Sequence, residues 1–78
     1  MEYDLIIARS VTFAQRMQKA LEQAGIRCWI FRAPRDLTDL GCAYAVQISR
    51  TETAYALSVL HRAGLDPVRM IHGREGGL

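Results

Sequence analysis

Cysteine and histidine are scarce in this sequence, with two of each among 78 residues. Scaffolds that depend on disulfides are far richer in cysteine, and the spacing of Cys28 and Cys42 matches no zinc or c-type haem pattern. Two histidines are also too few for most imidazole-based metal sites. We therefore expect a chain with no bound metal and no cofactor, whose thiols are reduced, as in a cytoplasmic protein.

The sequence also has little net charge and no long hydrophobic run. Its formal net charge of +2 is too small to indicate a nucleic-acid-binding surface by itself. No stretch approaches the roughly 20 apolar residues of a membrane span. Asp4 interrupts the N-terminal apolar run where a signal peptide would continue. We expect a cytoplasmic protein with no membrane partner.

What the sequence does contain is an internal repeat with a period of 39 residues. Five positions are identical in the two copies: Ser10 and Ser49, Thr12 and Thr51, Leu21 and Leu60, Ala24 and Ala63, and Gly25 and Gly64. Each copy predicts a strand, a helix and a second strand. Two such units predict an α+β fold of the ferredoxin-like βαββαβ type, with a four-stranded antiparallel sheet in the order 4-1-3-2 and both helices on one face.

Local patterns give the expected bounds of these elements. Short apolar runs predict four strands, over residues 3–8, 27–32, 42–48 and 68–72. Apolar residues at helical spacing predict two helices, over residues 12–24 and 51–63. We expect a single domain over residues 1–72, followed by a flexible C-terminal tail over residues 73–78.

Capping signals support both helices. Two pairs of residues have the spacing of a capping box, Thr12 with Gln15 and Ser49 with Glu52. A start at Ser10 is the alternative for the first helix. Gly25 and Gly64 are expected to end the helices, because glycine readily takes the left-handed conformation found just after a helix.

The sheet face away from the helices is a candidate interface. The aromatic residues that could cluster there are Tyr3, Trp29, Phe31 and Tyr44. Which of them do so depends on strand register, since a shift of one residue reverses the face of every side chain. Exposed apolar area on such a face is typical of a protein interface. We expect a homodimer that forms through this face or through the edge of strand 27–32.

The segment with candidate chemistry is 34–42. Cys42 lies where this loop meets the third strand, and Gly41 lets the backbone bend there. Nearby guanidinium groups favour the thiolate, which can carry sulfur or selenium, form a mixed disulfide or sense an oxidant. The alternative, a small buried hydrophobe, is the role we expect for Cys28. The residues expected around Cys42, at one end of the sheet, are Arg32, Pro34, Arg35, Gly41 and Arg50.

This segment also carries a family resemblance. The chain resembles the putative selenium/sulfur carrier protein-like family of small bacterial domains over nearly its whole length, and most clearly in Pro34-Arg35-Asp36-Leu37-Thr38, followed by Gly41-Cys42. The resemblance implies that Cys42 is the carrier residue and that Pro34 and Arg35 shape the loop. The chain departs from the family pattern by one additional residue before Gly41 and by Ala43 in place of the usual glycine.

Three functions stay open on the sequence alone. The first is a sulfur or selenium carrier, or a thiol-based redox adaptor, that acts through Cys42 with a donor or acceptor protein as partner. The second is a non-enzymatic dimeric module that binds a small ligand or a protein. The third, nucleic-acid binding, is disfavoured because the basic-glycine-aromatic run of RNA-recognition domains is missing. We expect a carrier or binding protein rather than an enzyme, and no carboxylate partner for His61 or His72.

Overall fold

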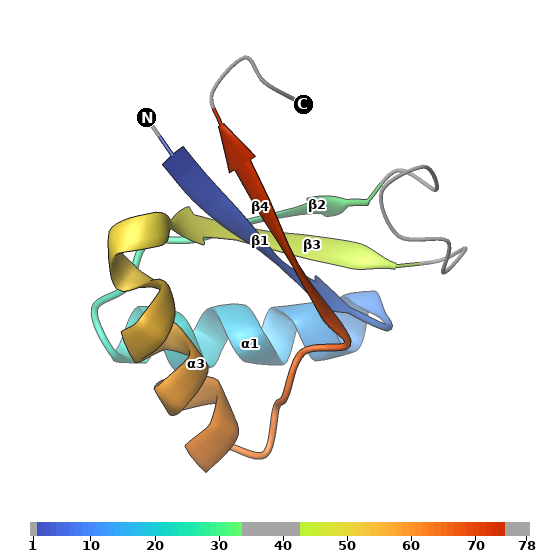
Figure 1. Ribbon diagram of the computed structural model, residues 1–78. Helices are drawn as coiled ribbons and strands as arrows, with labels where there is room; N and C mark the ends of the chain where they lie inside the picture. The colour runs from blue at the N-terminus through green and yellow to red at the C-terminus, as the bar shows by residue number, and fades with distance from the viewer. Residues whose placement is uncertain (1, 34–42, 75–78) are drawn as a thin grey trace.

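The computed structural model describes residues 2–33 and 43–74 (Figure 1). Its elements are, in chain order, β1 (Glu2–Ala8), α1 (Val11–Gln23), β2 (Trp29–Arg32), β3 (Tyr44–Ser49), the short 3-10 helix η1 (Arg50–Glu52), α3 (Thr53–Arg62) and β4 (Arg69–Arg74). The order βαββαβ is the one that the repeat predicts. In the part of the chain that the structure describes, no helix is long and apolar enough to cross a membrane.

The four strands form one sheet in the order β2-β3-β1-β4. β1 pairs antiparallel with β3 on one side and with β4 on the other, and β2 pairs antiparallel with β3. Read from the opposite edge, this is the predicted order 4-1-3-2. The predicted α+β class, the antiparallel sheet and its strand order are therefore confirmed.

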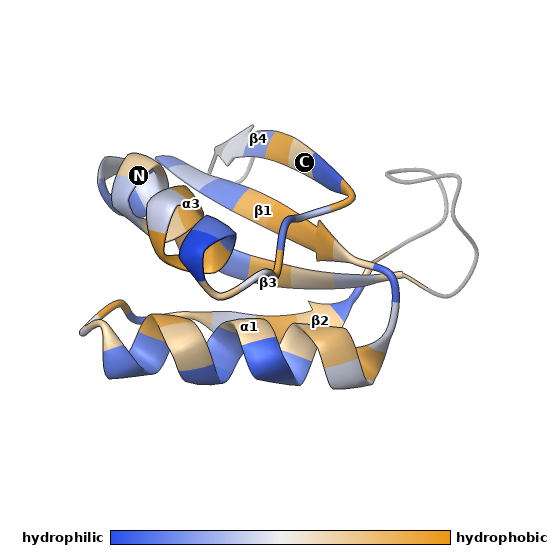
Figure 2. Cartoon of the chain, turned by 90° about the horizontal axis from the view of Figure 1, so that it is seen from below, coloured by the Kyte–Doolittle hydropathy of each residue, from blue (hydrophilic) through white to orange (hydrophobic). Residues whose placement is uncertain are grey.

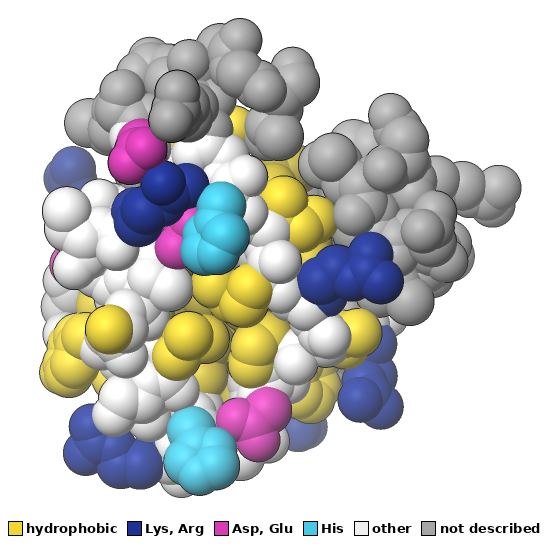
Figure 3. All heavy atoms as spheres, viewed as in Figure 1, with side chains coloured by type: hydrophobic (Ala, Val, Ile, Leu, Met, Phe, Trp, Pro, Cys, Tyr) yellow, Lys and Arg dark blue, Asp and Glu magenta, His cyan; other side chains and the backbone are white. Residues whose placement is uncertain are grey.

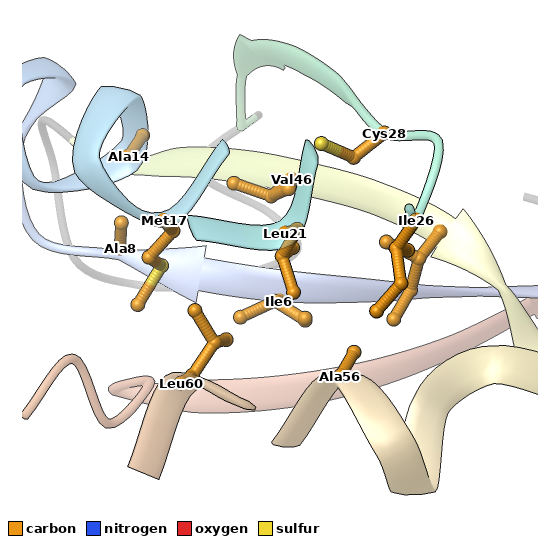
Figure 4. Close-up of a cluster of buried hydrophobic side chains, with 11 residues drawn as sticks. Ile6, Ala8, Ala14, Met17, Leu21, Ile26, Cys28, Val46, Ala56 and Leu60 are labelled. Carbon is orange, nitrogen blue, oxygen red and sulfur yellow. The ribbon is translucent and has the colours of Figure 1, made fainter. Parts of the chain in front are cut away.

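Both helices pack against the same face of the sheet, where the main core lies (Figure 4). This core joins fully buried side chains of β1 and β3 to the inner stripes of the two helices: Ile6, Val46, Ile48, Ala14, Met17, Leu21, Ala56 and Leu60. In α1, Ala14, Met17 and Leu21 are spaced so that they lie on one side of the helix. Figure 2 shows the hydrophilic residues of α1 along the side that faces away from the sheet.

The opposite face of the sheet carries a second, smaller apolar cluster. Leu5, Ile7 and Ala45 are its fully buried members on the central strands, and Tyr3 and Ile71 pack against them. Since side chains alternate between the faces of a strand, β1 contributes Leu5 and Ile7 to this cluster. The residue between them belongs to the main core. The central strand is thus apolar on both faces.

Register decides which aromatic residues share this second face. Trp29 is aligned with Gln47 and Phe31 with Ala45, which places both aromatic side chains on the face away from the helices, as predicted. They are also exposed, Trp29 to 57% and Phe31 to 38%. Tyr44 packs against the main core instead. The sequence left the face of Tyr44 open, and the register decides it: Tyr44 precedes Ala45 by one residue and therefore points to the other face.

The N-terminus of α1 is capped by Ser10, whose Oγ accepts a hydrogen bond from the N–H of Phe13 at 3.2 Å. Thr12 lies within the helix, so the capping box at Thr12 is not the one used. The second predicted box, at Ser49, is not formed either, because the Ser49 hydroxyl pairs with that of Thr51 at 2.9 Å. The chain there first makes η1, and α3 begins at Thr53.

The C-termini of the helices follow the prediction. Gly25 has φ +82° and Gly64 has φ +73°, both in the left-handed region. The N–H of Ile26 reaches back to the carbonyl of Leu21 at 2.9 Å, and that of Leu65 to the carbonyl of Leu60 at 2.8 Å. These bonds satisfy carbonyl groups that the helix end would otherwise leave unpaired.

Several strand ends differ from the prediction by one or two residues, as at β2 and β4. β2 begins at Trp29 rather than at residue 27, so Cys28 precedes the strand. β4 continues to Arg74 rather than ending at residue 72, because Gly73 pairs with Tyr3 of β1. A side chain at Gly73 would meet the Tyr3 ring, since a Cβ built there lies 2.6 Å from Tyr3 Cε2.

Candidate functional site

The two residues that flank the candidate segment 34–42 are hydrogen-bonded to each other. The N–H of Ala33, which follows β2, donates to the carbonyl of Ala43 at 3.0 Å, and both alanines are buried. The chain therefore leaves and re-enters the described structure at two adjacent, hydrogen-bonded positions. Four predicted site residues lie outside the described residues: Pro34, Arg35, Gly41 and Cys42.

Among the described residues, three arginines lie at this end of the sheet. Arg32 is aligned with Tyr44, the first residue of β3, and Arg69 is aligned with Ile7 of β1. Arg9 directly follows β1, and its guanidinium carbon lies 5.8 Å from the centre of the Phe13 ring. Of these three, the prediction from sequence named only Arg32. Arg9 and Arg69 were not predicted. They lie here because strand pairing brings the end of β1 and the start of β4 to the same end of the sheet.

Arg50 lies at the opposite end of the sheet, which corrects the expectation that it lies near Arg32. It follows Ser49, the last residue of β3, and Ser49 is aligned with Tyr3 near the start of β1. A strand rises about 3.3 Å per residue, so β3 alone separates Arg50 from Ala43 by roughly 20 Å. At that separation the guanidinium group of Arg50 is screened from a thiol beside Ala43.

Arg50 instead belongs to a polar cluster around Asp4. The Asp4 carboxylate is buried, with 1% of its area exposed. It accepts hydrogen bonds from Thr53 Oγ1 at 2.6 Å, Arg50 Nε at 3.1 Å and His72 Nδ1 at 2.6 Å. Burial raises the pKa of Asp4, but the hydrogen bonds from Thr53, His72 and Arg50 outweigh it and hold that pKa below its ordinary value.

This Asp4 cluster ties together four segments of the chain. Besides Asp4, the Arg50 guanidinium contacts the carboxylate of Glu2 at 3.0 Å and the carbonyl of Gly73 at 3.2 Å. The cluster thus links β1, η1, α3 and β4 at one end of the sheet. In Figure 3 a histidine lies beside basic and acidic side chains at this end. Because the carboxylate is saturated by donors, the arrangement explains how a charge is held in the interior.

The prediction from sequence missed these partners of histidine. His72 pairs with Asp4, and His61 pairs with Asp66 at 3.1 Å, although no carboxylate partner was expected for either. The His61 pair is exposed on both sides and contributes little to stability. The sequence did contain a signal for the His72 pair. Asp4 is an acid within an apolar strand, and a buried carboxylate requires hydrogen-bond donors. His72 stays 69% exposed, so its ring is oriented by Asp4 and open to solvent.

Cys28 is a packing residue, as predicted. It is 8% exposed, belongs to the main core, and its sulfur lies 3.9 Å from the carbonyl of Gln18 (Figure 4). Burial, and in second place the negative charge of Glu22, raises the pKa of the Cys28 thiol to about 11. The sulfur is therefore held in its protonated, unreactive form near neutral pH.

Two features of the described surface bear on ligand binding, its side chains that can bind metal and its hollows. Within residues 2–33 and 43–74, no group of three or more His, Cys, Asp or Glu side chains could hold a metal ion. A hollow of about 370 Å³ lies beside Trp29, lined also by Tyr3, Gln47 and Ser49. It is at the same end of the sheet as Arg50, and thus away from the point where segment 34–42 joins.

Comparison with known families identifies the chain. The model of the family described as "Putative Se/S carrier protein-like" matches residues 2–72. The chain belongs to this family. The match covers α1, α3 and the first three strands completely, and it includes segment 34–42 with Cys42. The family resemblance predicted from the sequence is thus confirmed. A search of curated proteins found no match to the chain.

Proposed function

We propose that this protein carries sulfur or selenium on Cys42. The observation that carries the proposal is the state of the other cysteine. The chain has two cysteines, and a carrier in this family needs one reactive thiol. Cys28 is buried with a thiol pKa of about 11, so at pH 7 only about one molecule in ten thousand would have it as thiolate. Cys42 is then the remaining candidate.

The three arginines at the end of the sheet where segment 34–42 begins and ends support this assignment. Cys42 is bonded directly to Ala43, and Arg9, Arg32 and Arg69 lie at the same end of the sheet as that residue. Positive charge near a thiol favours the thiolate. It also favours a persulfide or perselenide, which is an anion when deprotonated. We propose that these arginines lower the pKa of Cys42 and help to retain the loaded atom.

The loading step is an exchange in which no net oxidation occurs. The Cys42 thiolate attacks the terminal sulfur of a persulfide on a donor protein. A new S–S bond forms at Cys42, the S–S bond of the donor breaks, and its electron pair leaves with the donor thiolate. The proton of the terminal sulfur stays with it. A donor perselenide transfers selenium by the same exchange, and release to an acceptor thiol is the reverse process.

We further propose that the architecture is ferredoxin-like and that the protein works in the cytoplasm. Support for the first is the βαββαβ order together with an antiparallel sheet in which β1 and β3 are central and both helices pack on one face. Support for the second is chemical. A carrier thiol must be returned to its reduced form, and the cytoplasm is a reducing compartment.

The test is loading by a small-molecule persulfide, followed by mass spectrometry of the intact protein without reductant. We expect the wild-type chain and Cys28→Ser to gain the mass of one sulfur atom, which a thiol reductant removes. Cys42→Ser should gain none. Both variants keep one cysteine each, so they are matched in thiol content. Loading that persists in Cys42→Ser and disappears in Cys28→Ser would assign the chemistry to Cys28 and overturn the proposal.

A further inference from the structure

We infer that the protein self-associates through the outer edge of β2, with two copies pairing antiparallel around a two-fold axis at Ile30. This places Trp29 of one copy opposite Phe31 of the other on the sheet face away from the helices. The inference depends on the geometry of β2 and is independent of any chemistry at Cys42. It also selects one of the two modes that the sequence left open, the strand edge rather than the sheet face.

The starting observation is that β2 is an edge strand. Among the described strands it is paired with β3 on one side and is the last member of the sheet on the other. An edge strand offers a row of backbone donors and acceptors to any further strand. Proteins commonly protect such edges with lysine, proline or a bulge. The first three residues of β2 are instead the apolar Trp29-Ile30-Phe31.

The backbone groups of Ile30 point out from this edge. Ala33 donates its N–H to Ala43 of the neighbouring chain segment, so Ala33 is a position whose backbone groups are directed toward β3. In an antiparallel pair such positions alternate along the strand. Trp29 and Phe31 therefore also direct their backbone N–H and carbonyl groups toward β3. Ile30, between them, directs its N–H and carbonyl away from β3.

A two-fold axis at Ile30 uses these groups symmetrically. Ile30 then becomes its own partner, and each copy donates its Ile30 N–H to the Ile30 carbonyl of the other. The next bonded positions in this register are Cys28 and Arg32 of the second copy. A two-fold axis is also the most common symmetry of soluble homo-oligomers, since one patch then serves both copies.

The side chains select the same register. On the outer face, Trp29 of each copy meets Phe31 of the other, so the two exposed aromatic residues of the strand cover one another twice. Aromatic cross-strand pairs stabilise antiparallel strands. Moving the axis to Phe31 would instead place Trp29 opposite Ala33, which is already buried. The Ile30 register also separates Arg27 from Arg32, so that no two arginines face each other across the edge.

The test uses two double variants with charges at the same two exposed positions. In Trp29→Lys with Phe31→Lys, the Ile30 register brings two like-charged pairs together. In Trp29→Lys with Phe31→Glu, the same register brings two opposite charges together. We expect light scattering to give twice the 8.8 kDa chain mass for the wild type and for the Lys/Glu variant. For the Lys/Lys variant we expect the single chain mass, with dimer affinity at least roughly tenfold weaker.

A mixing experiment removes misfolding as an explanation. A third variant, Trp29→Glu with Phe31→Glu, should also be monomeric alone and should form a heterodimer when it is mixed with the Lys/Lys variant. A wild type that stays monomeric at millimolar concentration would overturn the inference. So would a dimeric Lys/Lys variant, or a Lys/Glu variant as monomeric as the Lys/Lys variant, because the Ile30 register pairs opposite charges in the Lys/Glu variant and like charges in the Lys/Lys variant.

Discussion

At the scale of single residues, Asp4 stands out among the described residues, because its side chain is charged and almost completely buried. Asp4→Asn keeps its shape but removes the charge that faces Arg50 and His72. Asparagine has one acceptor oxygen where Asp4 has two, so its buried NH2 group would face a donor that the carboxylate now accepts from. We expect the free energy of unfolding to fall by about 3 kcal/mol, as measured by urea denaturation at pH 7.

Glu2→Gln is the matched control for this variant. Glu2 also contacts Arg50, at 3.0 Å, but its side chain is 46% exposed. An exposed ion pair contributes at most about 1 kcal/mol. Equal losses of stability in the two variants would mean that the burial of Asp4 does not determine its energetic importance.

Asp4 also predicts a dependence of stability on acid. Its pKa in the folded protein lies below the ordinary value of 3.8. The unfolded chain therefore binds a proton at this site more readily than the folded chain. The stability that Asp4 contributes is fully present above pH 3.8 and is lost as the pH falls through its folded pKa. Urea midpoints between pH 2 and pH 5 should show this loss in the wild type and less of it in Asp4→Asn.

Cys28 gives a prediction of the opposite kind, at alkaline pH. Its pKa rises from 9.0 to about 11 on folding, so the unfolded chain loses this proton first. Stability from Cys28 is fully present below pH 9 and falls as the pH rises toward 11. In the native protein a thiol reagent at pH 7 should modify Cys42 first, and modification of Cys28 should require unfolding or alkali. Faster modification of Cys28 at pH 7 would contradict both its packing role and the carrier proposal.

Substitution of Cys28 by serine places a hydroxyl in the main core. We expect Cys28→Ser to lower the free energy of unfolding by about 1–3 kcal/mol, measured in urea beside the wild type. Cys28→Ala keeps the site apolar and is the control, since it leaves no hydroxyl to satisfy. A smaller loss for the serine variant than for the alanine variant would show that the site admits water.

Single residues also show where prediction from sequence reaches its limit. The packing role of Cys28 could be predicted, because it lies among apolar residues of its own segment. The pairing of Asp4 with His72 could not, since 68 residues separate them and only the β1–β4 register brings them together. Arg50 was predicted at the wrong end of the sheet for the same reason, because its place depends on the length and pairing of β3 rather than on its sequence neighbours.

At the scale of elements, the ends of the helices were predictable and their starts less so. Gly25 and Gly64 have positive φ, a conformation that other residues reach only with strain. A helix start offers several competing side chains within three or four residues. Ser10 prevailed over Thr12, and the hydroxyl of Thr53 was taken by Asp4 rather than by the helix end.

Gly25 allows this strain to be measured without a steric contribution. A Cβ at Gly25 would have no neighbour within 4 Å, so the cost of a substitution there is that of the backbone alone. We expect Gly25→Ala to lower the free energy of unfolding by about 1 kcal/mol and Gly25→Asn by less, because asparagine tolerates the left-handed region better. Urea denaturation of the two variants checks this order, which the reverse ranking would refute.

The repeat itself has a limit at this scale. Leu21 and Leu60 are equivalent in it and both lie in the main core. Ile7 and Val46 are also equivalent by position, yet Ile7 belongs to the outer cluster and Val46 to the main core. The period of 39 therefore aligns the helices correctly but places the strands on opposite faces. Strand residues that share a face are offset by one position from this period, as in the pair Ile7 and Ala45, and an offset of one position reverses the face of every side chain in a strand.

At the scale of the whole molecule, the topology could be predicted because two strand-helix-strand units in 78 residues have few ways to share one core. The position of the exposed apolar side chains could not be predicted, since it follows from strand register. Trp29 and Phe31 are exposed apolar side chains on an edge strand. A small domain of modest stability gains stability when a second copy covers such side chains. Association would then contribute to the stability of the fold itself.

This coupling makes the melting temperature depend on protein concentration. If the folded form is a dimer through β2, a tenfold rise in concentration stabilises it by about 1.4 kcal/mol per dimer, or roughly 0.7 kcal/mol per chain. For a domain of this size, that corresponds to a rise of about 4 °C in the melting temperature. We expect this rise for the wild type and for Trp29→Lys with Phe31→Glu, and a constant value for Trp29→Lys with Phe31→Lys. A wild-type melting temperature that is constant over a hundredfold range of concentration would mean that the β2 edge stays unpaired in solution, whatever Cys42 carries.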